Sequence, residues 1–229
     1  QFLNRSIKTL NSGGKTFTQA IFISSPGGGI QLVTNNLTIP DGTLENGTVD
    51  LNGLTLTSGS FDTNSGTKNI TFNGGTLSLS GSGATVWNNA NPTNFTTTAG
   101  TGTGAISMTS ASAKTFVGGG STYNCNLNQG GAGALTITDS NTFDNITNTV
   151  QPASVLFTAG TTSTFSNFSL SGTAGNLITI GSVTAASHTL SKASGTVSSD
   201  FLSISRSTAT GGADWYAGAN STDSGNNSG

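Results

Sequence analysis

The chain has 229 residues, of which only 7% are charged, and its formal net charge is −2. Its seven lysines and arginines are scattered, which argues against a nucleic-acid partner, and no apolar run approaches the roughly 18 residues of a membrane span. The single cysteine excludes an internal disulfide framework.

The composition indicates an ordered β-rich chain. Glycine takes 33 positions, yet Ile, Val, Leu and Phe recur regularly and only 4 prolines occur. Disordered chains usually lack such β-branched and aromatic residues. Apolar recurrence at helical spacing is absent, and short alternating runs lie between Gly, Ser, Asn and Asp clusters. We therefore expect strands and turns with an uncharged polar surface.

The first 34 residues are expected to form an N-terminal cap or connector. They contain KTFTQAIFI at 15–23 and the glycine cluster SPGGG at 25–29. A stacked β-structure needs an atypical cover at its end, because an open edge strand invites aggregation. The chain begins with Gln1 and shows no basic-then-apolar leader, so we expect a processed product or an excerpt of a longer protein.

Short strands are predicted from residue 35 onward, at uneven intervals. Examples are NLTI at 36–39, GLTLT at 53–57, NITF at 69–72 and TLSLS at 76–80. Between about 81 and 104 the apolar pattern fades. We expect an irregular coil or a long surface loop there.

A repeat becomes clear after residue 120. The motif T-aromatic-x-(N/C) recurs at Tyr123, Phe143 and Phe165, with near-constant spacing. A second, apolar series runs out of phase with it, at Leu135, Val155, Ile178 and Leu202. Self-similarity at such a period is typical of stacked architectures.

The period favours a solenoid over a sandwich, because two distinguishable strand types alternate. We predict a right-handed parallel β-helix with coils of about 20–24 residues. It would span residues 35–206, with an insertion near 81–104 and a cap or connector at 207–229. About ten coils, spaced at the interstrand distance, give a rod on the order of 50 Å.

The scarcity of charge fits this architecture. Outward side chains of stacked coils form ladders in which like charges would repel one another. Asn145 and Asn167 occupy equivalent positions in the motif. We expect them to stack as an internal amide ladder at a turn.

A resemblance covers the last part of the chain. The segment LSGTAGNLITIGSVTAASHTLSKASGTVSSDFLSIS at 170–205, followed by STATGGADWYAGANSTDSGNNSG, resembles the end of β-helical modules in virion proteins of tailed bacteriophages. The match is best over roughly 130–229. It implies a structural protein, fibre or spike, with no agreed active site to carry over. The family pattern commonly continues past GNNSG with a Trp, where this chain stops. Similar β-helices also occur in bacterial surface adhesins.

Catalytic and metal motifs are weak. A glycosidase needs two carboxylates about 5–10 Å apart, and Asp139 and Asp144 are a pair close in sequence, but turn contexts favour Asp for backbone reasons. His188 is the only histidine and is expected in the wall of a coil, as is Cys125. The usual zinc sets are therefore excluded, and we expect no catalytic residue, no metal and no cofactor.

Recognition is the remaining functional hypothesis. Trp87, Trp215 and Tyr216 lie outside the repeat in Gly- and Asn-rich segments, where exposed aromatics often stack on sugars; Trp215 could equally plug the end of the rod. We expect a virion or other extracellular protein whose partners are virion proteins and host-surface glycans, and a homotrimer is compatible with flat faces. The alternatives are a bacterial adhesin or self-assembling filament, and a polysaccharide-degrading tailspike.

Overall fold

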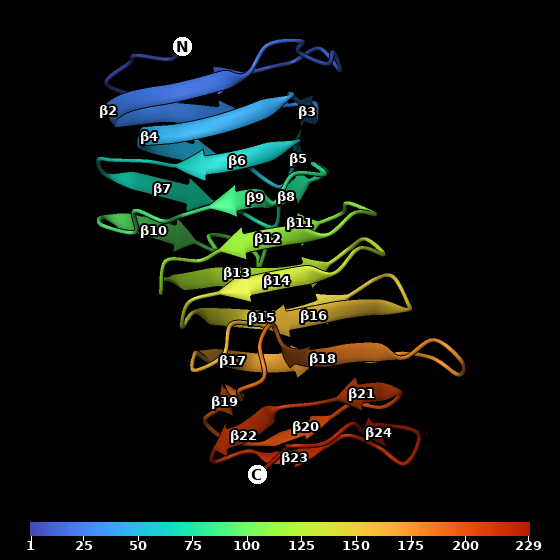
Figure 1. Cartoon of the computed structure of the whole chain (residues 1–229). Coiled ribbons are helices and arrows are strands. Elements are labelled where there is room, and N and C mark those ends of the chain that lie inside the picture. Colours follow the sequence, from blue (N-terminus) through green and yellow to red (C-terminus); the bar gives the residue numbers. More distant parts are fainter.

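The computed structural model describes all 229 residues and consists of strands and turns, with no helix. Consequently no helix is available to cross a membrane. The strands pair in parallel and stack into a solenoid of about ten turns, with the two termini at opposite ends (Figure 1). The predicted all-β parallel solenoid and its number of coils are thus confirmed.

The strand pairings define three faces, which we name A, B and C. Face A contains the starts of β2 (Ile21–Leu32) and β4 (Asp41–Asp50), followed by β6 (Ser60–Thr63), β9 (Thr85–Asn88), β12 (Lys114–Val117), β14 (Leu135–Thr138), β16 (Ala153–Phe157), β18 (Ile178–Ser182), β21 (Leu202–Ile204) and β24 (Thr222–Asp223). The sequence suggested only two strand types in each coil.

Faces B and C complete each coil. Face B contains β1 (Ile7–Leu10), the ends of β2 and β4, then β7 (Lys68–Thr71), β10 (Phe95–Thr98), the starts of β13 (Thr122–Gln129), β15 (Thr142–Asn148) and β17 (Thr162–Ser169), then β19 (His188–Lys192) and β22 (Ser207–Gly211). Face C contains β3 (Leu37–Thr38), β5 (Thr55–Ser58), β8 (Thr76–Leu79), β11 (Ala105–Met108), the ends of β13, β15 and β17, and beyond them β20 (Thr196–Ser198) and β23 (Asp214–Tyr216).

One continuous core runs along the rod because alternate residues of each strand point inward. A single inward column on face C illustrates it. Its members are paired coil to coil and are all buried: Leu37, Leu56, Leu77, Ile106, Leu127, Ile146 and Phe168. Burial of each such side chain contributes about 1.5–3 kcal/mol, so the stack as a whole holds the coils together.

The predicted aromatic repeat is confirmed. Tyr123 pairs with Phe143, and Phe143 with Phe165. Their rings stack with centroids 5.2 and 6.0 Å apart. The fourth position of the motif needs one correction: Asn126, not Cys125, pairs with Asn145, because β13 carries an extra residue at this point.

The coils vary in length more than predicted. The step along the chain from Leu44 to its partner Thr63 is short, whereas the step from Trp87 to its partner Phe116 is clearly longer. The second apolar series is in place, although Val155 faces Ile180 and not Ile178. Turns of different length absorb the variation, so the predicted range of coil lengths was too narrow.

The three segments expected to break the repeat take part in it. Residues 1–34 contribute β1 and β2, which pair in the ladder. Residues 81–104 contribute β9 and β10, so the expected insertion is a rung of the solenoid. Residues 207–229 contribute β22, β23 and β24. Long turns between these strands hid the period from sequence inspection.

The corner between faces B and C has two forms. In the upper coils, which begin with β4, β6 and β9, separate strands are joined by loops, and Asn52 and Asn73 hold positive φ there. In the lower coils, which begin with β12, β14 and β16, the two faces belong to one bent strand: β13, β15 or β17. The change of form falls between β10 and β13.

Candidate functional site

The ladder of face B is interrupted between β10 and β13. On one side β10 pairs with β7; on the other, β13 pairs with β11 and β15, and no backbone ladder joins β10 to β13. The corner shortens at this point, from the loop at 99–104 to the single bend at Cys125. The ladder of face B therefore ends at β10 and begins again at β13, and the sheet is open between them.

Side chains bridge the opening where backbone bonds are missing. The Asn124 backbone N–H donates to Thr97 Oγ1 at 2.7 Å, and Asn124 Nδ2 donates to the Thr97 carbonyl at 2.7 Å. The Thr97 hydroxyl in turn donates to the Thr122 carbonyl at 3.5 Å. The threonine hydroxyl therefore takes the place of a ladder bond and holds the two strand edges apart.

The opening forms an open groove of about 530 Å³ on the surface of face B. Its lining carries hydroxyl and amide groups and no ionisable group: Thr96, Thr97, Thr98, Ser121, Thr122 and Asn124 lie around Phe95. Thr96, Thr98, Thr122 and Asn124 are exposed.

The groove rests on a rigid aromatic cluster. The Phe95 ring lies 5.6 Å from Tyr123 and 5.9 Å from Trp87, measured between centroids. Trp87 Nε1 donates to the Tyr123 hydroxyl at 3.0 Å, and that hydroxyl donates to the Gly118 carbonyl at 2.8 Å. Burial raises the pKa of Tyr123, so the phenol stays neutral.

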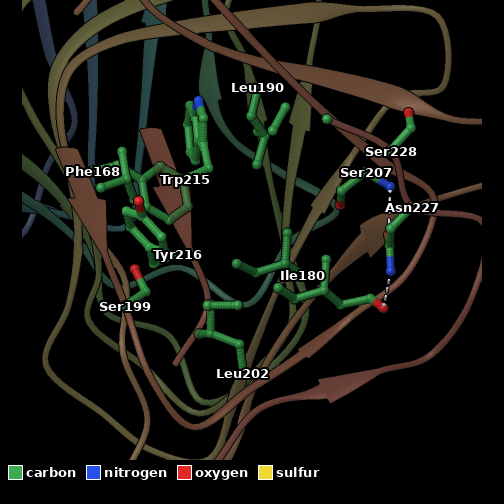
Figure 2. Close-up of a pocket in the computed structure, with 15 residues that line it drawn as sticks. Phe168, Ile180, Leu190, Ser199, Leu202, Ser207, Trp215, Tyr216, Asn227 and Ser228 are labelled. Carbon is green, nitrogen blue, oxygen red and sulfur yellow. Dashed lines mark hydrogen bonds between the residues drawn. The ribbon is translucent and has the colours of Figure 1, made fainter. Parts of the chain in front are cut away.

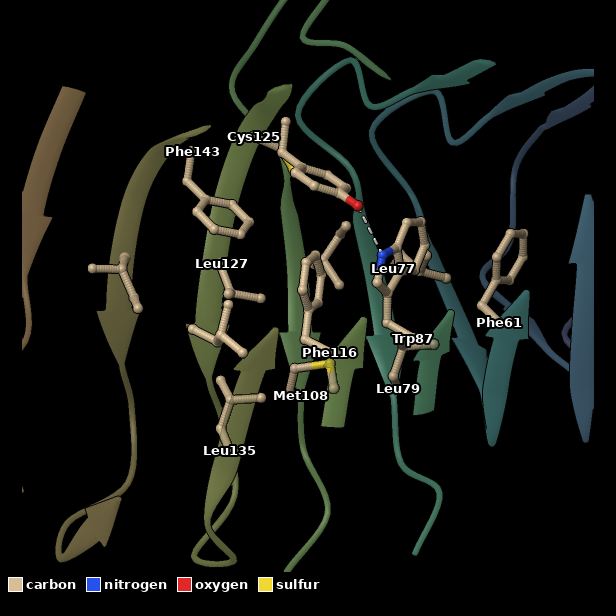
Figure 3. Close-up of a cluster of buried hydrophobic side chains, with 14 of the residues drawn as sticks. Phe61, Leu77, Leu79, Trp87, Met108, Phe116, Cys125, Leu127, Leu135 and Phe143 are labelled. Carbon is tan, nitrogen blue, oxygen red and sulfur yellow. Dashed lines mark hydrogen bonds between the residues drawn. The ribbon is translucent and has the colours of Figure 1, made fainter. Parts of the chain in front are cut away.

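Trp87 itself is not a surface residue, which corrects the sequence-based expectation. Its side chain is 0% exposed and stacks between Phe61 and Phe116 at 6.0 and 5.6 Å (Figure 3). Both of these pairing partners lie far from Trp87 in the sequence, so no local pattern marks it as a core residue. It cannot contact a sugar.

A second hollow lies at the C-terminal end of the rod (Figure 2). This apolar cavity of about 180 Å³ is lined in part by Trp215 and Tyr216. Trp215 is half-buried and packs edge-on against Phe168 at 5.4 Å, as expected of a plug, whereas Tyr216 is 59% exposed. Ser199 also lines the cavity, and its buried Oγ has no hydrogen-bond partner.

Asn145 and Asn167 pair in register, but not as an internal amide ladder. Both lie within strands and point outward, Asn145 half-buried and Asn167 exposed. Asn145 Nδ2 donates to Ser169 Oγ at 3.1 Å, and its Oδ1 has no partner. The bend interrupts the two-residue alternation: after the inward ring of Phe143 or Phe165 two successive side chains point outward, the second of which is the asparagine.

The lone histidine and cysteine are enclosed in the wall of the coils. His188 is 1% exposed, stacks on Phe157 at 4.7 Å, and contacts Ser182 Oγ and Ser207 Oγ at 2.9 and 3.1 Å. Burial lowers its pKa to about 4. Cys125 is fully buried in β13, and burial raises its thiol pKa. Neither group is placed where a substrate could reach it.

Two lysines are buried without a carboxylate partner, and the sequence did not distinguish them from the other five. Lys68 Nζ donates to the carbonyls of Asn64, Asn91 and Thr93 at 2.5, 2.9 and 3.1 Å. Lys114 Nζ donates to those of Ser110 and Gly133. Burial lowers the pKa of Lys114 to about 8. Each ammonium group ties turns of neighbouring coils together.

Asp139 and Asp50 accept hydrogen bonds from neighbouring coils. Asp139 Oδ2 accepts from the Gly119 N–H at 2.9 Å and from Thr138 Oγ1 at 2.7 Å. Asp50 accepts from Gln31 and Asn73 of the neighbouring coils. Such contacts give these two aspartates a structural role that requires no catalytic function.

Metal ligands do not gather anywhere in the chain, since no group of three or more His, Cys, Asp or Glu side chains lies together. The groove of face B has a polar lining, and the C-terminal cavity has a largely apolar one. Comparison with protein-family models, with curated proteins and with solved structures found no match for this chain.

Proposed function

We propose that the chain is a structural module of a bacteriophage virion, in a fibre, a spike or a capsid decoration. It acts as a stiff extracellular arm that holds or forms a surface for contact with the host. Other virion proteins are its partners, host-surface glycans are its ligands, and its role is not enzymatic. Association of three rods through their flat faces belongs to the same proposal.

The observation that carries the proposal is the continuous core within one parallel ladder of about ten turns. A rod built in this way resists bending, because each coil is paired with the next on at least one face by a backbone ladder. Its outward strand positions are mostly Thr, Ser and Asn, which suits an extended surface that must stay soluble with few charges. The resemblance of residues 130–229 to phage β-helical modules supports an extracellular β-helix, and the virion is the location that we propose for it.

Immunogold labelling tests the location. Antibodies against the chain are expected to decorate phage particles purified from the source culture and to leave uninfected cells unlabelled. Label on the surface or filaments of uninfected bacteria would contradict the virion assignment and favour the adhesin or filament hypothesis.

Two further measurements test the activity. The fluorescently labelled chain is expected to remain on host cells after washing, with little retention on non-host cells. In a reducing-sugar assay on host capsule, we expect no product above the buffer control. Sustained product release would overturn the non-enzymatic role and favour a polysaccharide-degrading tailspike.

A further inference from the structure

The groove at the interrupted ladder differs from the rest of face B. Along β13, β15 and β17 the outward column Thr122, Thr142, Thr164 is in continuous register, so these side chains form a flat ridge. Between β10 and β13 the register is lost, and a hollow of about 530 Å³ replaces the ridge. The hollow lies where backbone pairing is missing, at the level where the two corner types meet.

The hydrogen-bonding groups of the groove are partly uncommitted. Thr96 and Thr98 both donate to Asn69 Oδ1, at 3.0 and 3.1 Å, which leaves their oxygens free to accept. Asn124 uses its N–H groups on Thr97, while its Oδ1 makes no hydrogen bond within the protein. The groove therefore offers acceptors on Thr96, Thr98 and Asn124, next to the Thr122 hydroxyl, which makes no hydrogen bond within the protein and can donate.

The lining chemistry selects the ligand class. An ionised ligand would find no opposite charge among the lining residues. A neutral polyhydroxylated ligand can donate to the free acceptors and accept from the hydroxyl groups. The bridged strand edges and the aromatic floor hold these groups in place before binding, which reduces the entropic cost of association.

We propose that this groove binds a short uncharged segment of a glycan chain. The inference rests on the proposed role in host-surface contact and names the ligand and the site for it. Thr96 and Thr98 form one wall, and Thr122 and Asn124 form the other.

Binding of uncharged oligosaccharides of two to six units tests the site, with sialylated and sulfated oligosaccharides on the same array as the charged comparison. Thr122→Phe and Thr98→Phe fill the groove from opposite walls and are each expected to weaken binding at least about tenfold. Thr164→Phe is the matched control, because the same residue type lies in the same column two coils away. It is expected to leave binding within about twofold. Thermal unfolding checks that each variant is folded, and either groove variant alone suffices.

Three results would contradict the proposal that the groove binds an uncharged glycan segment. The first is binding confined to charged oligosaccharides, and the second is binding weakened equally by Thr164→Phe. The third is no binding of any uncharged oligosaccharide by a chain that still adheres to host cells, which leaves the proposed adhesive role intact. If the chain neither adheres to host cells nor binds any oligosaccharide on the array, both the adhesive role and the glycan-binding groove are contradicted.

Discussion

The upper and lower coils enclose the same kind of core with different corners between faces B and C. In the upper coils the corner is a loop, with positive φ at Asn52 and Asn73 and glycines that fit close to neighbouring backbone. In the lower coils one strand bends across the corner and a stacked ring fills the space inside it. The comparison shows that a solenoid can turn either through backbone freedom or through side-chain packing.

The largest expected effect concerns the ring stack of the lower coils. Phe143 lies 5.2 Å from Tyr123 and 6.0 Å from Phe165, and its side chain is 1% exposed. Phe143→Ala leaves a cavity at the bend and is expected to lower the free energy of unfolding by about 3–5 kcal/mol in urea denaturation. Phe143→Leu, which keeps most of the volume, should lose less than half as much. Equal losses would mean that filled volume at the bend is not what supports it.

The next effect concerns the upper corners. A Cβ added at Gly104 would lie 2.4 Å from the Gly75 carbonyl oxygen and 2.4 Å from Phe72 Cβ. Gly104→Ala is therefore expected to lower the melting temperature and to lower stability by about 2 kcal/mol. Ser166→Ala at a lower bend, where the side chain is exposed, should stay within about 0.5 kcal/mol. Similar effects at both sites would remove the distinction between the two corner types.

A pH-dependent effect is expected below the lower coils, at His188. Its pKa in the folded chain is about 4, below the ordinary value of 6.5. Between these values the unfolded chain binds a proton that the folded chain does not, so stability falls as the pH drops from 6.5 to 4, by about 2 kcal/mol. His188→Gln should flatten this slope in urea denaturation at several pH values. An unchanged slope would assign the acid sensitivity to other groups.

The smallest expected effect concerns the paired asparagines on face C and what Asn145 contributes to stability. Asn145 donates one hydrogen bond and leaves a buried acceptor unpaired. Asn145→Val removes both and suits a strand, so stability should change by less than about 0.5 kcal/mol. A loss above about 1 kcal/mol in thermal unfolding would show that the paired asparagines stabilise the lower coils more than their contacts indicate.

The sequence predicted the fold largely from the lower coils. There one strand forms two faces of each coil, so the coil length varies little. Tyr123, Phe143 and Phe165 therefore recur at a near-constant interval, and the period can be recognised in the sequence. In the upper coils each corner adds its own loop, and the period is lost although the ladder continues. Residues 81–104 look irregular for this reason, and Trp87 looks exposed.

The residues that form the candidate groove could not be predicted from the sequence. The sequence directed attention to the region near residues 81–104, but it proposed an aromatic contact where the structure has threonines and an asparagine. The groove exists because β10 and β13 do not pair. The amino-acid sequence of neither strand indicates that this pairing is missing. The buried lysines were missed for a related reason, since their partners are backbone carbonyls contributed by turns.

The side-chain bridge between β10 and β13 also has a mechanical consequence. At this level, faces A and C stay joined by backbone ladders, through β9 with β12 and β11 with β13, while face B is held by Thr97 and Asn124. Under a sideways load on the rod, these few bonds would yield before the ladders do. Opening would therefore start on face B at this level, while faces A and C stay joined there by their backbone ladders.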